Sequence, residues 1–98
     1  MWLNESDDYK ELSRIMHDAY LQSANGKGKE RHANGEAWEK QPMNTIANEE
    51  GIAFLTGQAK KKIGEAKRLP RGMAINELRG AINYLCGAIY YLETHEED

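Results

Sequence analysis

The sequence predicts an all-α protein, a compact bundle of about four helices that ends in a helical hairpin. Apolar residues of segment 74–93 recur at alternating spacings of three and four. Two further sets of residues, each containing two glycines, recur at i, i+4, i+7 and i+11, a spacing that places each set on one face of a helix. At 98 residues, the chain is expected to form a single domain, residues 1–98, with frayed ends at 1–5 and 94–98.

The first helix is expected over residues 6–24. Ser6 is a suitable N-cap, and Asn25-Gly26 is a typical helix end. The apolar positions of this segment follow a helical period: Tyr9, Leu12, Ile15, Met16, Ala19 and Tyr20.

Residues 25–41 are predicted to form a loop, because the segment contains three glycines and no sustained periodicity. Trp38 is expected to anchor the far end of this loop in the core. A short second helix is predicted to begin at Pro42, since proline is favoured in a first turn, and to end near Gly51.

The third helix is predicted over residues 52–69, followed by a chain reversal at Pro70-Arg71-Gly72. Its expected core face carries Ile52, Leu55, Ala59, Ile63, Ala66 and Leu69. Its opposite face carries Gly57, Lys61, Gly64 and Arg68.

The fourth helix, residues 74–93, has two faces of different character. Its expected core face is an apolar seam, by which we mean Ile75, Leu78, Ile82, Leu85, Ile89 and Leu92. The other face is a glycine–tyrosine stripe, by which we mean Gly80, Tyr84, Gly87 and Tyr91. Because a helix with two apolar faces is usually buried on both, the stripe is predicted to form the interface of a homo-oligomer.

The same stripe suggests a ligand site between helices or subunits. Tyr84 or Tyr91 could stack on a planar ring, and Asn83 could supply hydrogen bonds to a base edge. On the third helix, Lys61 and Arg68 are candidates to hold a phosphate. The alternative is that these cations only solvate an exposed helix.

Composition restricts the remaining functions. The net charge is −3 with 30% charged residues, and no apolar run approaches the roughly 20 residues that span a bilayer. A cytoplasmic protein without membrane association is therefore expected. The single Cys86 is predicted to be a small buried apolar side chain, since it has no partner for an internal disulfide.

No catalytic constellation, metal site or cofactor is predicted. Helical nucleotide pyrophosphohydrolases of the MazG type pair Glu-x-x-Glu with Glu-x-x-Asp to hold Mg²⁺. In this chain, the segment that begins at Glu77 has Gly80 where the second carboxylate should be, which weakens such a site.

Residues 32–92 resemble the SaV-like phage proteins, a family of unknown function whose domain also occurs in a phage nucleotide kinase. The resemblance runs through His32, Asn34-Gly35, Ile46, segment 54–61 and segment 77–85. Lys62 and Asn83 stand where that family has aromatic residues, and no nucleotide-binding loop is present. The resemblance implies a phage accessory protein.

Three hypotheses of function follow. The first is a non-enzymatic, oligomeric binding module that sequesters an anionic nucleotide-like ligand as a counter-defence, with Arg31 and His32 assisting Lys61 and Arg68. The second is a protein that inhibits a host enzyme by direct contact. The third is a Mg²⁺-dependent enzyme of nucleotide metabolism. Nucleic-acid binding is less expected, because the total charge is negative.

Overall fold

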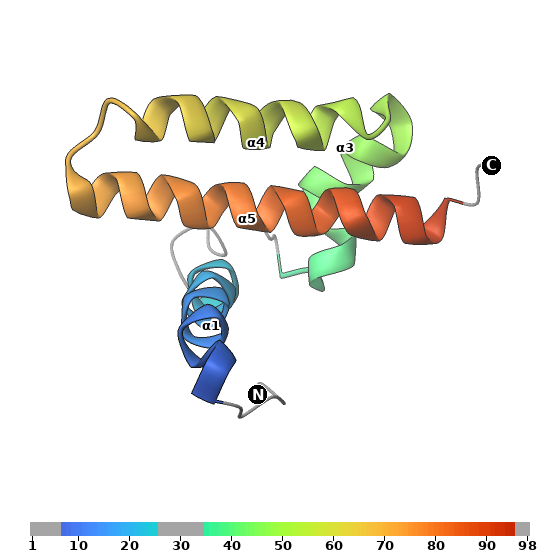
Figure 1. Cartoon of the computed structure of the whole chain (residues 1–98). Coiled ribbons are helices and arrows are strands. Elements are labelled where there is room, and N and C mark those ends of the chain that lie inside the picture. Colours follow the sequence, from blue (N-terminus) through green and yellow to red (C-terminus); the bar gives the residue numbers. More distant parts are fainter. Residues whose placement is uncertain (1–6, 26–34, 96–98) are drawn as a thin grey trace.

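The computed structural model describes residues 7–25 and 35–95, and the ordered elements of these two segments are all helical (Figure 1). This confirms the predicted all-α class. The elements are η1 (Asp7–Tyr9), α1 (Lys10–Asn25), η2 (Trp38–Lys40), α3 (Pro42–Glu50), α4 (Ala53–Ala66) and α5 (Arg71–Thr94).

Helices α4 and α5 form an antiparallel hairpin, and α3 packs against one end of it (Figure 1). The predicted hairpin is therefore confirmed, but its turn lies nearer the N-terminus than expected: α4 ends at Ala66 rather than at residue 69, and α5 begins at Arg71 rather than at residue 74. Pro70 lies directly before the first residue of α5 and its carbonyl accepts a hydrogen bond from Ala74 N–H at 2.8 Å. Proline is well suited to this position because its missing N–H would have no partner inside the helix. Arg71 and Gly72 consequently belong to α5 rather than to the turn.

Helix α3 begins and ends where the sequence predicts. Pro42 occupies its first turn, and Gly51 ends it with φ 97°, a conformation that favours glycine. The Gly51 N–H donates to the Ala47 carbonyl at 2.7 Å. This sharp end turns the chain directly into α4.

The core lies where α3, α4 and α5 meet. Leu55 is fully buried there together with Ala47 and Ala88, and Met43, Ile52, Phe54, Tyr84 and Tyr91 pack around them. Gly87 is also buried, and a Cβ built on it would lie 2.6 Å from Met43 Cε. The small residues of α5 thus let the larger side chains of α3 and α4 approach its backbone closely.

The predicted assignment of the two faces of α5 is wrong. The glycine–tyrosine stripe faces α3 and α4, so it forms an interface within the chain. The apolar seam, predicted to be the core face, is largely exposed: Ile75, Leu78, Leu85, Ile89 and Leu92 retain between 42% and 63% of their accessible surface. On α4, Leu55 and Ala59 are buried as predicted, whereas Ile63 is 41% exposed.

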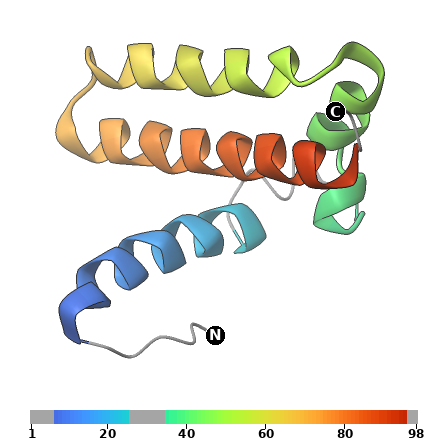
Figure 2. The same cartoon turned by 45° about the vertical axis from the view of Figure 1, so that its right-hand side comes forward.

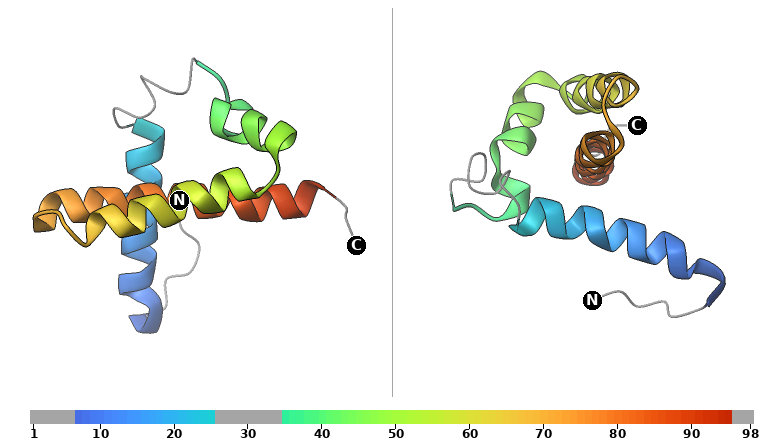
Figure 3. Two further views of the ribbon diagram at one scale, coloured as in Figure 1. Left: turned by 90° about the horizontal axis from the view of Figure 1, so that it is seen from above. Right: turned by 90° about the vertical axis from the view of Figure 1, so that its left-hand side faces the viewer.

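Helix α1 crosses beneath α5 and projects beyond it (Figures 2 and 3). Of its periodic apolar residues only Ala19 is buried. Its attachments to α5 lie in its C-terminal half. Gln22 Nε2 donates to the Asn76 carbonyl at 3.0 Å, and Asp18 Oδ2 forms an ion pair with Arg79 Nη2 at 3.6 Å. The N-terminal half of α1 therefore extends past the rest of the described chain.

The described part of the predicted loop, residues 35–41, includes the short helix η2. Trp38 joins this segment to α5, because its indole N–H donates to Asn83 Oδ1 at 2.9 Å and its ring meets the Tyr90 ring edge-on at 5.7 Å. The side chain remains partly exposed. Trp38 therefore anchors this segment to α5, but it does so outside the core in which it was expected to lie.

Candidate functional site

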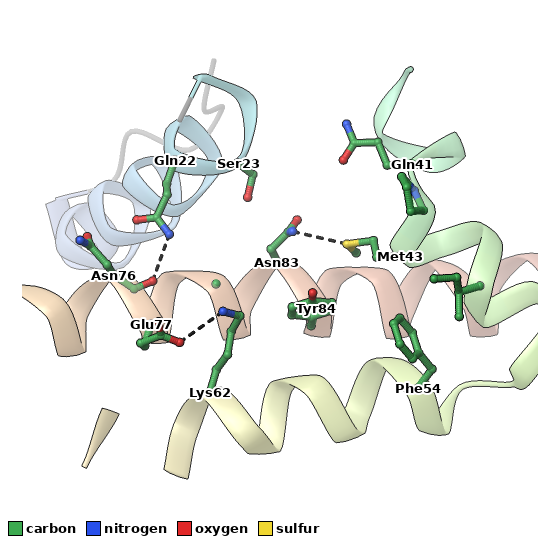
Figure 4. Close-up of a pocket in the computed structure, with 13 residues that line it drawn as sticks. Gln22, Ser23, Gln41, Met43, Phe54, Lys62, Asn76, Glu77, Asn83 and Tyr84 are labelled. Atoms are coloured by element: carbon green, nitrogen blue, oxygen red, sulfur yellow. Dashed lines mark hydrogen bonds and ion pairs between the residues drawn. The ribbon is translucent and has the colours of Figure 1, made fainter. Parts of the chain in front are cut away.

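A pocket of about 560 Å³ opens between the C-terminal end of α1, the start of α3 and the facing sides of α4 and α5 (Figure 4). This volume falls within the range of small-molecule sites, roughly 300 to 1,000 Å³. Its lining combines apolar side chains with amide and charged groups. The lining residues are Gln22, Ser23, Gln41, Pro42, Met43, Ile46, Phe54, Lys62, Asn76, Glu77, Gly80, Asn83 and Tyr84.

One wall of the pocket carries an ion pair between the two helices of the hairpin. Lys62 Nζ of α4 lies 3.2 Å from Glu77 Oε1 of α5, and each side chain is 29% exposed. A pair this accessible contributes less than about 1 kcal/mol to stability. A ligand group could therefore displace one partner at little cost to the fold.

Gly80 gives Lys62 the room to lie along α5. A Cβ built on Gly80 would be 2.9 Å from Lys62 Cδ and 3.0 Å from Cε. Any side chain at this position would push the lysine stem aside. The glycine therefore helps to place the ammonium group at the pocket wall beside Glu77.

Asn83 is the pocket residue whose orientation is best defined. Because an indole N–H only donates, the Asn83 oxygen must face Trp38, and the amide nitrogen is left to face Met43 (Figure 4). That Nδ2 lies 3.4 Å from Met43 Sδ, and a thioether is a weak acceptor. The pocket thus presents an oriented N–H₂ donor that is paired only weakly.

The structure brings some of the predicted ligand-binding residues together and separates others. Asn83 and Tyr84 both line the pocket. Tyr91 does not, because it packs beside the core and stacks on His95 with ring centroids 3.8 Å apart. Of the glycines in the stripe, Gly80 lines the pocket and Gly87 lies in the core.

The predicted cationic residues lie elsewhere. Lys61 is exposed on α4 and Arg68 is exposed in the turn that follows α4. Neither lines the pocket, so the structure does not join them to Tyr84 in one site. Arg31 and His32 fall outside the described residues. The cation that does reach the pocket is Lys62, which the sequence analysis assigned no binding role.

The residues missed by the sequence analysis come from distant segments. Gln22 of α1 and Met43 of α3 reach the pocket only through the packing of the helices on α5. A signal for Lys62 and Glu77 was present, since opposite charges that flank a tight helical turn can meet across a hairpin. Their separation of fifteen residues hid this pairing from an analysis of single helix faces.

Cys86 corrects a further prediction, because its side chain is exposed rather than buried in the core. Nearby protein atoms still remove part of its hydration, and this desolvation raises the pKa of the thiol above its ordinary value.

Within residues 7–25 and 35–95, no three His, Cys, Asp or Glu side chains cluster as a metal site would require. None of the helices in these segments has the length and apolar character needed to cross a membrane. Comparison with protein-family models, curated protein sequences and solved structures gives no significant match to this chain.

Proposed function

We propose that the chain is a non-enzymatic binding module whose pocket holds a small nucleotide-like ligand by its base. The observation that carries the proposal is the orientation of Asn83. Its amide nitrogen exchanges a thioether for a ligand oxygen or ring nitrogen, a stronger acceptor. The exchange satisfies the ligand without disturbing the bond from Trp38 to the amide oxygen.

The rest of the lining suits a planar group with polar edges. Phe54 and Tyr84 provide aromatic surface, and Glu77 supplies a carboxylate acceptor. Lys62 is the cation available to an anionic substituent such as phosphate, which would replace Glu77 as its partner. The near-neutral lining favours a ligand whose base fills the pocket and whose charge lies near Lys62.

Calorimetric titration of the chain with nucleosides, nucleotides and cyclic oligonucleotides tests this proposal. The most informative variant is Asn83→Asp, which keeps the acceptor for Trp38 and replaces the N–H₂ donor with an acceptor. We expect it to weaken binding at least tenfold, since it removes one hydrogen bond and adds repulsion.

A matched pair of lysine variants provides the control. Lys62→Gln should weaken the binding of a phosphorylated ligand. Lys61→Gln, at the adjacent exposed position, should bind the same ligand with wild-type affinity. Absence of heat with every ligand, or unchanged binding by both Asn83→Asp and Lys62→Gln, would contradict the proposal.

A further inference from the structure

The exposed seam of α5 lies on the same side of the molecule as an apolar arc at the start of the chain. By this arc we mean the exposed residues Tyr9, Leu12, Ile15, Met16 and Tyr20. Gly87 contacts α3, and at about 100° per residue the seam is centred about 180° round α5 from it, so the seam faces away from α3. The N-terminal half of α1 projects to this same side (Figure 3). We call these two adjoining apolar faces, one on α5 and one on α1, the apolar corner.

The α1 part of the corner continues a face that is already in use. Ala19 is buried between Asp18 and Gln22, the residues that attach α1 to α5, whereas the other large apolar side chains of its arc are exposed. They are Tyr9 of η1 and Leu12, Ile15, Met16 and Tyr20 of α1, which are between 38% and 59% exposed. An amphipathic helix of this length owes most of its stability to packing, so this face of α1 requires a covering surface.

The size of the corner matches a protein interface. Ten large apolar side chains of the seam and the arc are each about half exposed. Taking roughly 150 to 200 Å² for a fully exposed large side chain, they present roughly 800 Å². The largest apolar patch of a typical monomer is about 300 to 600 Å², whereas a stable dimer buries about 800 Å² on each partner.

We infer that a second copy of this chain occupies the apolar corner, with the projecting α1 of each copy packed against the α5 seam of the other. A surface of this area has to be covered as soon as the chain folds, and a second copy is present in equal amount. The arrangement is isologous, because a two-fold axis makes the two contacts identical: α1 of each copy packs against the apolar corner of the other. This interface uses the seam, in place of the glycine–tyrosine stripe that the sequence suggested.

The charges of α1 are consistent with an apolar partner. Arg14 pairs with Glu11 at 2.9 Å and with Asp18 at 3.3 Å, and these three residues lie outside the apolar arc of the helix. The arc itself carries no charge that would need a partner of opposite sign. A like apolar face, such as that of the second copy, is complementary to it.

Light scattering of the whole chain after size-exclusion chromatography, over a range of about 1 to 100 µM, tests the inference. We expect a mass of twice the 11.1 kDa chain. Ile89→Lys should shift the mass to one chain while circular dichroism still reports a helical protein. Leu12→Lys should weaken the dimer as well, because it places a charge on the apolar face of the projecting α1.

Met73→Lys is the matched control. Met73 and Ile89 are 56% and 57% exposed, and each precedes a glutamate of α5 by four residues, but Met73 lies on the other side of the helix. It should remain dimeric. A wild-type chain that is monomeric at every concentration, or a dimer that survives both Ile89→Lys and Leu12→Lys, would overturn the inference.

Discussion

Replacing Gly87 with alanine tests the close packing of α5 against α3 and α4. The new Cβ would lie 2.6 Å from Met43 Cε, 3.1 Å from Asn44 Oδ1 and 3.3 Å from Leu55 Cδ2. The methionine end can swing away. Leu55 is fully buried and Asn44 is held by a 2.8 Å bond from its Nδ2 to the Trp38 carbonyl, so these two neighbours have little freedom to move.

Two opposing effects set the change in the free energy of unfolding that Gly87→Ala causes. Overpacking a core costs about 1 to 3 kcal/mol, and exchanging glycine for alanine in a helix returns about 1 kcal/mol. The free energy of unfolding of Gly87→Ala should therefore fall by about 0 to 2 kcal/mol. Gly57→Ala is the matched control, since a Cβ at this exposed helical position meets no atom within 4 Å and should stabilise the protein by up to about 1 kcal/mol.

Thermal and urea unfolding followed by circular dichroism, at one fixed protein concentration, measure the difference between the two variants. We expect Gly57→Ala to be more stable than Gly87→Ala by about 1 to 3 kcal/mol, with about 4 to 8 °C of separation in Tm for each kcal/mol. Equal stabilisation by the two substitutions would refute the close approach at Gly87.

Other substitutions and a labelling experiment examine the core and the surface. Leu55→Ala should lower the free energy of unfolding by about 2 to 5 kcal/mol, while Leu21→Ala, at a side chain 39% exposed, should cost less than half as much in the same urea titration. Asn44→Ala should cost about 0.5 to 1.5 kcal/mol, because the Trp38 carbonyl loses one of its two donors and keeps the Gln41 N–H at 3.1 Å; an unchanged urea midpoint would show that the Asn44 bond contributes nothing. The raised pKa of Cys86 should make its alkylation at neutral pH slower than that of a small free thiol, and the alkylation rate should increase as the pH rises toward that pKa. Mass spectrometry of the labelled protein measures this rate. A rate equal to that of the small thiol would contradict the desolvation of Cys86.

Local signals in the sequence were sufficient to predict most helix boundaries. Pro42 and Gly51 delimit α3 because each residue has a backbone conformation that suits one end of a helix. Pro70 was interpreted as the end of one helix, although it lies directly before the next. Proline is compatible both with the end of one helix and with the residue before the next. The apolar periodicity of α5 alone therefore did not decide between these two positions for Pro70.

The sequence could not determine which face of α5 points inward. Large aliphatic residues of the seam gave the stronger periodic signal, but burial depends on what the neighbouring helices present. Gly87 and Ala88 pack inside because Met43 and Leu55 supply the volume that these small residues lack. Such complementarity between helices is a property of pairs and does not show in the periodicity of one segment.

The candidate site was predictable only in part, for the same reason. Asn83 and Tyr84 share a helix with the stripe and were identified from it. Lys62 was passed over in favour of Lys61, because its relevance depends on Glu77 across the hairpin and on the space left by Gly80. The orientation of Asn83 depends on Trp38, a residue 45 positions away.

The docking of α1 on α5 also has a consequence for the order of events during synthesis. Gln22 and Asn76, which join the two helices, are 54 residues apart. Lys62 and Glu77, which join α4 to α5, are 15 apart, and Met43 and Asn83, which join α3 to α5, are 40 apart. The short loops form sooner, because closing a long loop costs more entropy. On the ribosome α1 emerges before the helix that receives it, so Ala19 remains in water until α5 is complete. Docking of α1 is therefore expected to be the last step of folding within the chain.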